Sequence, residues 1–335
     1  MHGRVAEARH AIIFAKSPKY PDHVRCDPHR VSLKTMKAPC NDPNHDAITR
    51  FSLDDSGIRG VLVRLDSSWR DLLSHADYPA SVVACLGETC AASALFTGHI
   101  KTQARLSVQM RGTGVLRMIF AECTAAGAIR GIARHHLPIP DTVTPRDFGA
   151  DAMLAITIEQ SVAPQAEPVR YQGLVELDAD TLAQSFERYF AQSEQLPTRI
   201  ILGANTHCAA GLMLQRLPGT AADDDAWRRA TLLFDTLHGD ELRDTPVSTL
   251  LYRLFHEDGV RILDTRPLRF QCSCSRERVA NVLASLGESE AMASTQADGV
   301  AEITCEFCNR QYRFDRIDLA QLFVTDRVAP PSRQQ

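Results

Sequence analysis

Four of the ten cysteines stand in two close pairs near the end of the chain. Cys272-Ser273-Cys274 is separated by 30 residues from Cys305-Glu306-Phe307-Cys308. Thiolates combine negative charge with softness, so four of them make a complete ligand set for a tetrahedral zinc ion. The members of each pair can fold locally onto a metal, and the spacer returns the chain to bring in the second pair. The spacing therefore predicts one bound Zn2+ with the ligands Cys272, Cys274, Cys305 and Cys308.

Four unrelated core cysteines are the alternative interpretation of these pairs. The residues beside them are polar, among them Ser273, Ser275 and Asn309, which disfavours a purely apolar environment. Four arginines also lie close in sequence and either screen the negative charge of the thiolates or form an ordinary solvated surface. These are Arg276, Arg278, Arg310 and Arg313.

The spacer between the pairs contributes few large apolar side chains. The main ones are Val279, Val282, Leu283 and Leu286. A module with so small a core is expected to depend on its metal, because zinc binding contributes about 10–16 kcal/mol to the folding of such domains. Each pair is also short enough to close into a disulfide, so an oxidant can convert the ligands into disulfides and expel the metal. Spacing alone leaves open whether the site is a scaffold or a switch.

The charge balance restricts the partners. Lys and Arg number 37 against 41 Asp and Glu, which gives a net charge of −4. From residue 271 onward, seven basic residues stand against nine acidic ones, whereas a zinc module that grips nucleic acid is expected to be basic. We therefore predict no nucleic-acid partner and keep a zinc-ribbon nucleic-acid-binding protein as the alternative function.

The apolar runs are too short for a membrane protein. None approaches the ~20 residues that a membrane helix needs, and the stretch Ala11–Ala15 is shorter than the apolar region of a secretory signal. We expect a cytoplasmic protein with no membrane partner, in a compartment where thiols are kept reduced.

The pattern upstream of the cysteine pairs predicts a mixed α+β domain. Ser81 to Phe96 is apolar, rich in Ala and Leu and free of Pro, which predicts a buried helix. A second helix is predicted over 178–193, capped by Asp178 or Asp180. Several strands in succession followed by helices favour an α+β domain over alternating units. Apolar alternation places strands at 61–65, 106–110, 115–120, 127–134, 152–159, 169–177 and 198–204.

Four regions follow from these patterns. Residues 1–50 are rich in Pro, His, Lys and Arg, which predicts a disordered extension, and Met36 within it is an internal start candidate. Residues 51–222 are predicted to form the N-terminal α+β domain, and 271–325 the zinc module. The segment 223–270 reads as a helical linker; alternatively, its amphipathic helices belong permanently to the first core.

Several short runs along the chain match the sequence pattern of one known family. Gln192–Thr198 and the four-cysteine module are the most specific of these runs. The others are Ile58-Arg59-Gly60, Tyr78-Pro79, Leu86-Gly87-Glu88, Gln109 to Leu116, Tyr171-Gln172-Gly173, Gly211 to Pro218, Arg253-Leu254-Phe255-His256-Glu257 and Leu286-Gly287. Over about residues 50–323 the chain resembles the 33 kDa redox-regulated heat-shock chaperones. The N-terminal extension and the other six cysteines lie outside that resemblance.

The resemblance implies a metastable linker between an N-terminal α+β domain and a zinc-binding redox module. The reduced, zinc-bound form of such chaperones is inactive. Oxidation is expected to pair Cys272 with Cys274 and Cys305 with Cys308, to release zinc and to unfold the module and linker. The active form is then a homodimer that binds unfolding client proteins without ATP and without catalytic residues. We expect apolar linker residues to bind clients, namely Leu250, Leu251, Leu254 and Phe255.

The remaining cysteines and histidines leave two other possibilities. One is an enzyme whose nucleophile and base come from Cys123, His135, His136, His207 and Cys208. The other is a second metal site formed by His23, Cys26, His29, Cys40 and His45. Isolated residues of these types are more often structural, and we place Cys85 and Cys90 in the core.

Overall fold

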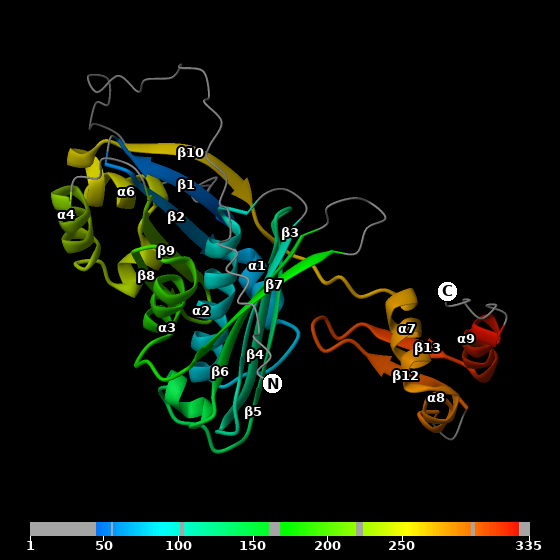
Figure 1. The fold of residues 1–335 in the computed structure, drawn as a ribbon. Helices are drawn as coiled ribbons and strands as arrows, with labels where there is room; N and C mark the ends of the chain where they lie inside the picture. Colours follow the sequence, from blue (N-terminus) through cyan, green and yellow to red (C-terminus); the bar gives the residue numbers. More distant parts are fainter. Residues whose placement is uncertain are drawn as a thin grey trace, which may run out of the picture.

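The computed structural model describes residues 45–54, 56–100, 104–160, 168–218, 224–295 and 299–327. Over these residues, two β-sheets enclose one long helix, α2 (Ala80–Thr97), and a smaller module follows at the C-terminal end (Figure 1). The architecture is mixed α+β, as the succession of strands predicts. We call the two sheets with their helices the sheet domain.

The first sheet has five strands in the order β10-β1-β2-β9-β8, all antiparallel. One face packs on α2 and the other on helices that follow later in the chain. Its strands are β1 (Ala47–Leu53), β2 (Ile58–Leu65), β8 (Thr198–Ala204), β9 (Ala209–Arg216) and β10 (Val260–Pro267).

The second sheet has six strands in the order β11-β5-β4-β3-β6-β7. Along β4, Ile119 and Ala121 belong to the core around α2, so Phe120 between them points to the outer face. Its strands are β3 (Ala104–Arg111), β4 (Leu116–Thr124), β5 (Ala128–His135), β6 (Met153–Gln160), β7 (Val169–Glu176) and the short β11 (Arg269–Phe270). The strands predicted from apolar alternation are confirmed in both sheets.

Helix α2 fills the space between the sheets. It is long and apolar enough to cross a membrane, but 78% of it is buried inside the molecule. A helix that is apolar all round is a core helix when protein covers every side. The prediction of a buried helix over 81–96 is confirmed, and its residues Cys85 and Cys90 are buried.

The segment predicted as a linker covers the outer face of the five-stranded sheet. It contributes α4 (Asp224–Phe234), α5 (Gly239–Asp244) and α6 (Val247–Phe255), and then adds β10 to the sheet edge. Phe255 stacks on Phe51 with ring centroids 6.0 Å apart. The buried Arg64 of β2 donates to the carbonyl oxygens of Leu242 and Thr245 at 2.7 and 2.6 Å. In this state the segment is therefore packed on the sheet domain.

The predicted cap of the second helix is wrong. The helix, α3 (Leu182–Tyr189), is capped by Thr181, whose side chain forms a reciprocal capping box with Gln184. Asp178 instead pairs with Arg188, and Asp180 binds Arg146. The Thr181 hydroxyl accepts from the Gln184 N–H, and the Gln184 side-chain oxygen accepts from the Thr181 N–H, a reciprocal pair that a single carboxylate further upstream does not provide.

Most of the predicted N-terminal extension lies outside the residues that the structure describes. Residues 1–44 are not described, and they include Met36, His23, Cys26, His29 and Cys40. His45 is described and pairs with Asp66 at 3.0 Å. Ala47 to Arg50, which we placed in the extension, form the start of β1.

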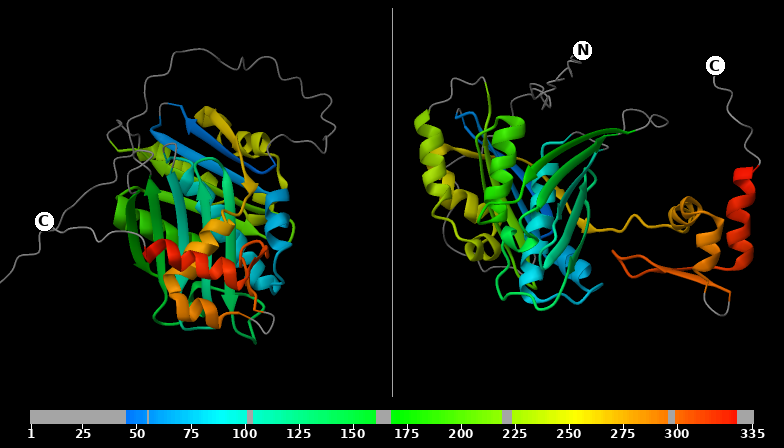
Figure 2. Two further views of the ribbon diagram at one scale, coloured as in Figure 1. Left: turned by 90° about the vertical axis from the view of Figure 1, so that its right-hand side faces the viewer. Right: turned by 60° about the horizontal axis from the view of Figure 1, so that its bottom comes forward.

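The C-terminal module lies over the outer face of the six-stranded sheet (Figures 1 and 2). It contains α7 (Arg276–Leu286), α8 (Glu288–Ala293), α9 (Arg316–Arg327) and a hairpin of β12 (Ala301–Thr304) and β13 (Gln311–Phe314). The remaining helices belong to the sheet domain: α1 (Ser67–Leu73), η1 (Pro145–Phe148), η2 (Phe190–Glu194) and η3 (His256–Asp258).

Candidate metal centre

The two cysteine pairs come from two different segments of the module. The first pair lies in the extended stretch between β11 and α7, where Ser275 caps the helix by accepting a backbone hydrogen bond. The second pair lies in the turn between β12 and β13. In that turn, the Cys305 N–H donates to the Arg310 carbonyl at 2.9 Å, and the Asn309 N–H to the Cys305 carbonyl at 2.8 Å. We call Cys305–Asn309 the knuckle.

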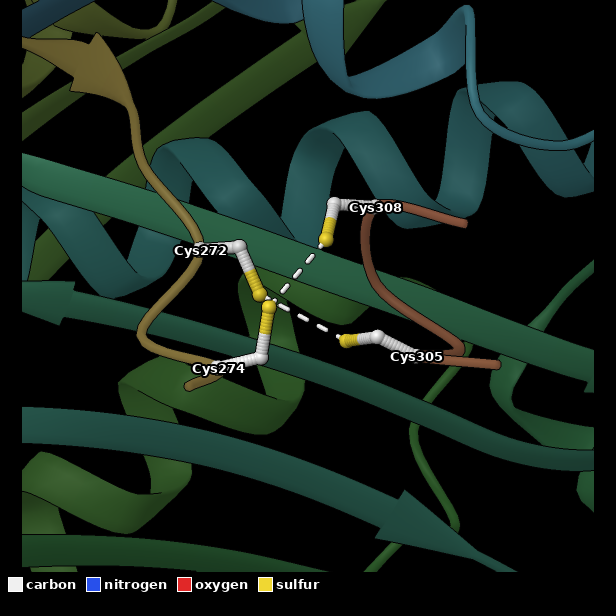
Figure 3. A group of neighbouring side chains, drawn as sticks. All are labelled: Cys272, Cys274, Cys305 and Cys308. Carbon is white, nitrogen blue, oxygen red and sulfur yellow. Dashed lines mark hydrogen bonds between the residues drawn. The ribbon is translucent and has the colours of Figure 1, made fainter. Parts of the chain in front are cut away.

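The four sulfurs are spaced as metal ligands rather than as disulfides. All lie within 4.8 Å of one another and point inward (Figure 3). Cys272 Sγ is 3.6 Å from Cys305 Sγ, and Cys274 Sγ is 3.4 Å from Cys308 Sγ. A tetrahedral site with Zn–S bonds of ~2.3 Å has sulfur–sulfur edges of ~3.8 Å, whereas a disulfide bond is ~2.05 Å long. The residues present therefore fit a single zinc ion.

The surroundings of two of these thiols change their pKa in opposite directions. Burial raises the pKa of Cys272 to about 12. Burial also acts on Cys274, but hydrogen bonds from Tyr312 and the neighbouring thiols outweigh it and lower its pKa to about 7. The Tyr312 hydroxyl donates to Cys274 Sγ at 3.1 Å. Cys274 therefore ionises before Cys272, and a cation that binds all four sulfurs displaces the protons that remain.

One of the four nearby arginines stands beside the thiols. The pKa of Arg310 is raised by its hydrogen bond with Tyr312 and by the charges of Tyr312, Cys274 and Cys308. The other three bind groups elsewhere, as Arg276 pairs with Asp318, Arg278 with the Ser273 carbonyl and Arg313 with Glu302. Screening of the site by arginine therefore falls to Arg310.

The core that holds this site together is small. Its fully buried residues are Leu283, Ala291, Ala301, Tyr312, Phe314 and Leu319. Two of the ligands, Cys274 and Cys305, pack against this cluster. Two of the candidate ligands are part of this small core. Disrupting the metal site would therefore weaken the apolar packing of the module as well as the coordination of the metal.

The knuckle also contacts the sheet domain. The Phe307 ring lies 4.4 Å from the Arg130 guanidinium and 5.8 Å from the Phe120 ring, which it meets edge to face. Glu306 accepts two hydrogen bonds from Arg134, at 2.5 and 2.6 Å. The Asn309 side-chain amide donates to the carbonyl of His75. Two residues between the metal ligands thus bind the outer face of β4 and β5.

The predicted client-binding residues lie away from this centre. Leu250, Leu251 and Phe255 are buried in α6, and Leu254 packs partly buried on the same cluster. They belong to the same apolar cluster as Phe51 of β1 and Leu62 of β2, on the outer face of the five-stranded sheet. In this state they are covered, and their contact with clients remains a prediction.

The residues considered for catalysis are dispersed. Burial raises the pKa of Cys123 to about 12 and that of Cys208 to about 11, so neither thiol is a ready thiolate at neutral pH. Cys123 lies in β4 of the six-stranded sheet, whereas Cys208 follows β8 of the other sheet. His135 contacts the ring of Tyr78 edge to face.

Sequence reasoning missed Tyr312 and the docking contacts. Tyr312 carries a usable signal, because it follows the second pair by only four residues, in β13. The partners of Glu306 and Phe307 carry none, since they lie more than 170 positions earlier. Only the packing of the module on the sheet brings them together.

Comparisons with known proteins agree with this geometry. The family model described as Hsp33 protein matches residues 46–315. The chain is 42% identical over 294 residues to the 33 kDa chaperonin of Pseudomonas fluorescens strain Pf0-1, covering 86% of this chain and 96% of the relative. It is 40% identical over 287 residues to the 33 kDa chaperonin of Nitrosococcus oceani, covering 86% and 97%.

A solved structure has the same fold. The crystal structure of the 33 kDa chaperonin from Thermotoga maritima superposes with a TM-score of 0.70 at 22% identity, covering 84% of this chain and all of that one. The four-thiol centre and the sheet domain thus occur in a chain that matches the family along most of its length. This protein belongs to the Hsp33 family of chaperones.

Proposed function

We propose that this chaperone is a redox-regulated holdase, which binds unfolding proteins without ATP and prevents their aggregation when an oxidant has acted on it. The observation that carries the proposal is the four-thiol centre. Its sulfurs are spaced for one metal ion, and they sit in a module with little other core. A module of this kind is bistable, because one chemical change at the sulfurs removes its main source of stability.

Zn2+ is the ion that four cysteine thiolates favour, held by Cys272, Cys274, Cys305 and Cys308. When bound, it supplies folding free energy of about 10–16 kcal/mol. With hydrogen peroxide, the two thiolates of a pair give up two electrons and form an S–S bond. The peroxide takes those electrons with two protons from solvent and becomes two waters. The proposed bonds join Cys272 to Cys274 and Cys305 to Cys308, which are separated by only one and two residues.

Disulfide formation removes the ligand set, so the module loses its stability and its docking on the sheet domain. The segment 223–270 then loses a neighbour, and its apolar residues Leu250, Leu251, Leu254 and Phe255 become available to clients. Exposed apolar surface also favours association of two copies, which accounts for the proposed active homodimer. We place the protein in the cytoplasm and assign it no enzymatic activity and no nucleic-acid or membrane partner.

The test compares the reduced, zinc-loaded protein with the protein treated with peroxide at mild heat. Treatment should release one zinc per chain, raise hydrophobic-dye binding and suppress light scattering by a thermally unfolding client. Cys208→Ser, which alters a cysteine outside the module, should switch normally. The proposal fails if the reduced form protects clients and the oxidised form does not. Binding of nucleic acid by the reduced form would instead favour the zinc-ribbon alternative.

A further inference from the structure

The surface beneath the knuckle has a definite chemistry. Phe120 of β4 and Arg130 of β5 form an aromatic and a cationic wall, and the Phe307 ring lies against both. Arg134, four positions along β5 from Arg130, takes the carboxylate of Glu306. Alternate residues of a strand share a face, so Arg130 and Arg134 both point outward from the sheet. We call Phe120, Arg130 and Arg134 the docking patch.

The wall of the patch is held in place without the knuckle. Arg130 is fixed by two hydrogen bonds to Glu122, at 3.0 and 3.3 Å, and its side chain is only 16% exposed. Phe120 is held by strand pairing, opposite Ile132 of β5. Because Phe120 and Arg130 are held by contacts within the sheet, this part of the docking patch is expected to keep its shape when the knuckle detaches from the sheet.

Arg134 has a different position. Its side chain is 58% exposed, and among the described residues its ion pair is with Glu306 alone. When the knuckle leaves, the guanidinium of Arg134 loses this partner while that of Arg130 keeps Glu122. The vacated patch therefore presents an aromatic slot beside one unpaired cation.

We propose that the docking patch is a client-binding site that the knuckle occupies in the reduced protein, and that it selects segments with an aromatic residue directly after an acidic one. This inference rests on the proposed function, because the patch opens only if oxidation unfolds the module. The knuckle residues that lie on the patch indicate what it binds. Glu306 places a carboxylate on Arg134, and Phe307 places a ring against Phe120 and Arg130. Edge-to-face aromatic contact and cation–π contact recognise the aromatic group, and the exposed cation recognises the acid.

The probe is a fluorescent ten-residue peptide that copies residues 302–311 with serine for both cysteines. Three binding measurements by anisotropy use the oxidised full-length protein with this peptide, with its Phe307→Ala version and with its Glu306→Lys version. The copied peptide should bind, and each change should weaken binding by about three- to tenfold, the range for one aromatic or ionic contact. The reduced, zinc-loaded protein should bind the copied peptide at least about tenfold more weakly, since its own knuckle fills the patch.

Charge reversal on the protein makes the test specific. Arg134→Glu should reverse the preference, so that the Glu306→Lys peptide binds more tightly than the copied one. Arg170→Glu is the matched control, because Arg170 lies on β7 at the opposite edge of the same sheet and is 61% exposed. It should leave the preference unchanged. Both substitutions are at exposed positions, so neither is expected to prevent folding.

Two outcomes overturn the inference: no binding of the copied peptide, or a peptide preference that Arg134→Glu leaves unchanged. If the oxidised protein still suppresses aggregation in either case, the proposed function stands and clients bind elsewhere. If the peptide preference follows Arg134 but oxidation gives no protection against aggregation, the patch is confirmed and the proposed function fails.

Discussion

The sheet domain and the zinc module are stabilised in different ways. The sheet domain buries two large apolar clusters, one around α2 between the sheets and one under α4–α6. The module buries six residues, and two of its four metal ligands complete that small cluster. Apolar burial changes little with redox state, whereas thiolate coordination is lost on oxidation. Under the proposed function, this difference lets the module respond to an oxidant while the sheet domain keeps its fold.

The contact between the regions is correspondingly light. It rests on Phe307, which meets the Phe120 ring edge to face and lies against Arg130, on the exposed pair of Glu306 with Arg134, and on one hydrogen bond from Asn309. Exposed ion pairs contribute about 0.2–1 kcal/mol each, far less than zinc binding. Under the proposed function, the docked position therefore depends mainly on a metal that keeps the knuckle folded, and only slightly on the contacts themselves.

The largest expected effect comes from removing two ligands. Replacing Cys305→Ser and Cys308→Ser together should abolish stoichiometric zinc and unfold the module, a loss on the order of 10 kcal/mol. The sheet domain should keep its melting transition. Zinc analysis and limited proteolysis measure the two effects. A double variant that retains one zinc per chain would refute the ligand assignment.

A core substitution in the linker segment should destabilise the sheet domain and leave the module unchanged. Phe255→Ala removes the ring that stacks on Phe51 and is expected to cost about 3–5 kcal/mol of unfolding free energy. Zinc content should stay at one per chain, because α6 contributes no ligand. Thermal unfolding followed by circular dichroism and a metal assay test this. Zinc loss in the reduced variant would show that the linker and the module fold as one unit.

The two regions should respond to pH in opposite directions. Burial raises the pKa of Glu88 on α2 to about 7, partly offset by the charge of Arg243. The folded state therefore holds a proton that the unfolded state has lost, and stability falls as pH rises from about 4.5 through 7, by roughly 3 kcal/mol. Glu88→Gln should flatten this slope and stabilise the sheet domain at pH 8, as measured by urea unfolding.

Asp71→Asn, which removes an exposed carboxylate, serves as the control variant for that measurement. The module should instead lose zinc affinity as pH falls, because protons compete with the metal for the thiolates. A Glu88→Gln variant with the wild-type slope would remove Glu88 as the cause.

The smallest expected effect concerns docking. Arg134→Gln removes an exposed ion pair and should weaken the contact of the knuckle with the sheet by less than about 1 kcal/mol. Hydrogen exchange of the knuckle amides should rise severalfold, with zinc content unchanged. Arg170→Gln on the same sheet serves as the reference. An unfolded module in Arg134→Gln would mean that docking, rather than metal, holds the module together.

Much of this molecule follows from the sequence because the decisive residues act locally. The two cysteines of each pair are separated by only one and two residues, so each pair is formed locally, and a return of the chain brings the two pairs together. Helix α2 is predictable from composition, since a long stretch rich in Ala and Leu and free of Pro needs protein around it. The hairpin of β3 and β4 is likewise set by alternation on either side of a glycine-containing turn.

Other features were decided only by tertiary structure. Thr181 rather than Asp178 caps α3, because the cap depends on where the chain turns. The segment after α6 becomes β10 because the edge of β1 offers unpaired backbone groups at that place. The docking of Phe307 on Phe120 and Arg130 joins residues far apart in the chain, and no local pattern reports it. Sequence spacing determines that the two cysteines of each pair lie close together, because that is settled within a few residues. Which surface the module covers is settled by long-range packing.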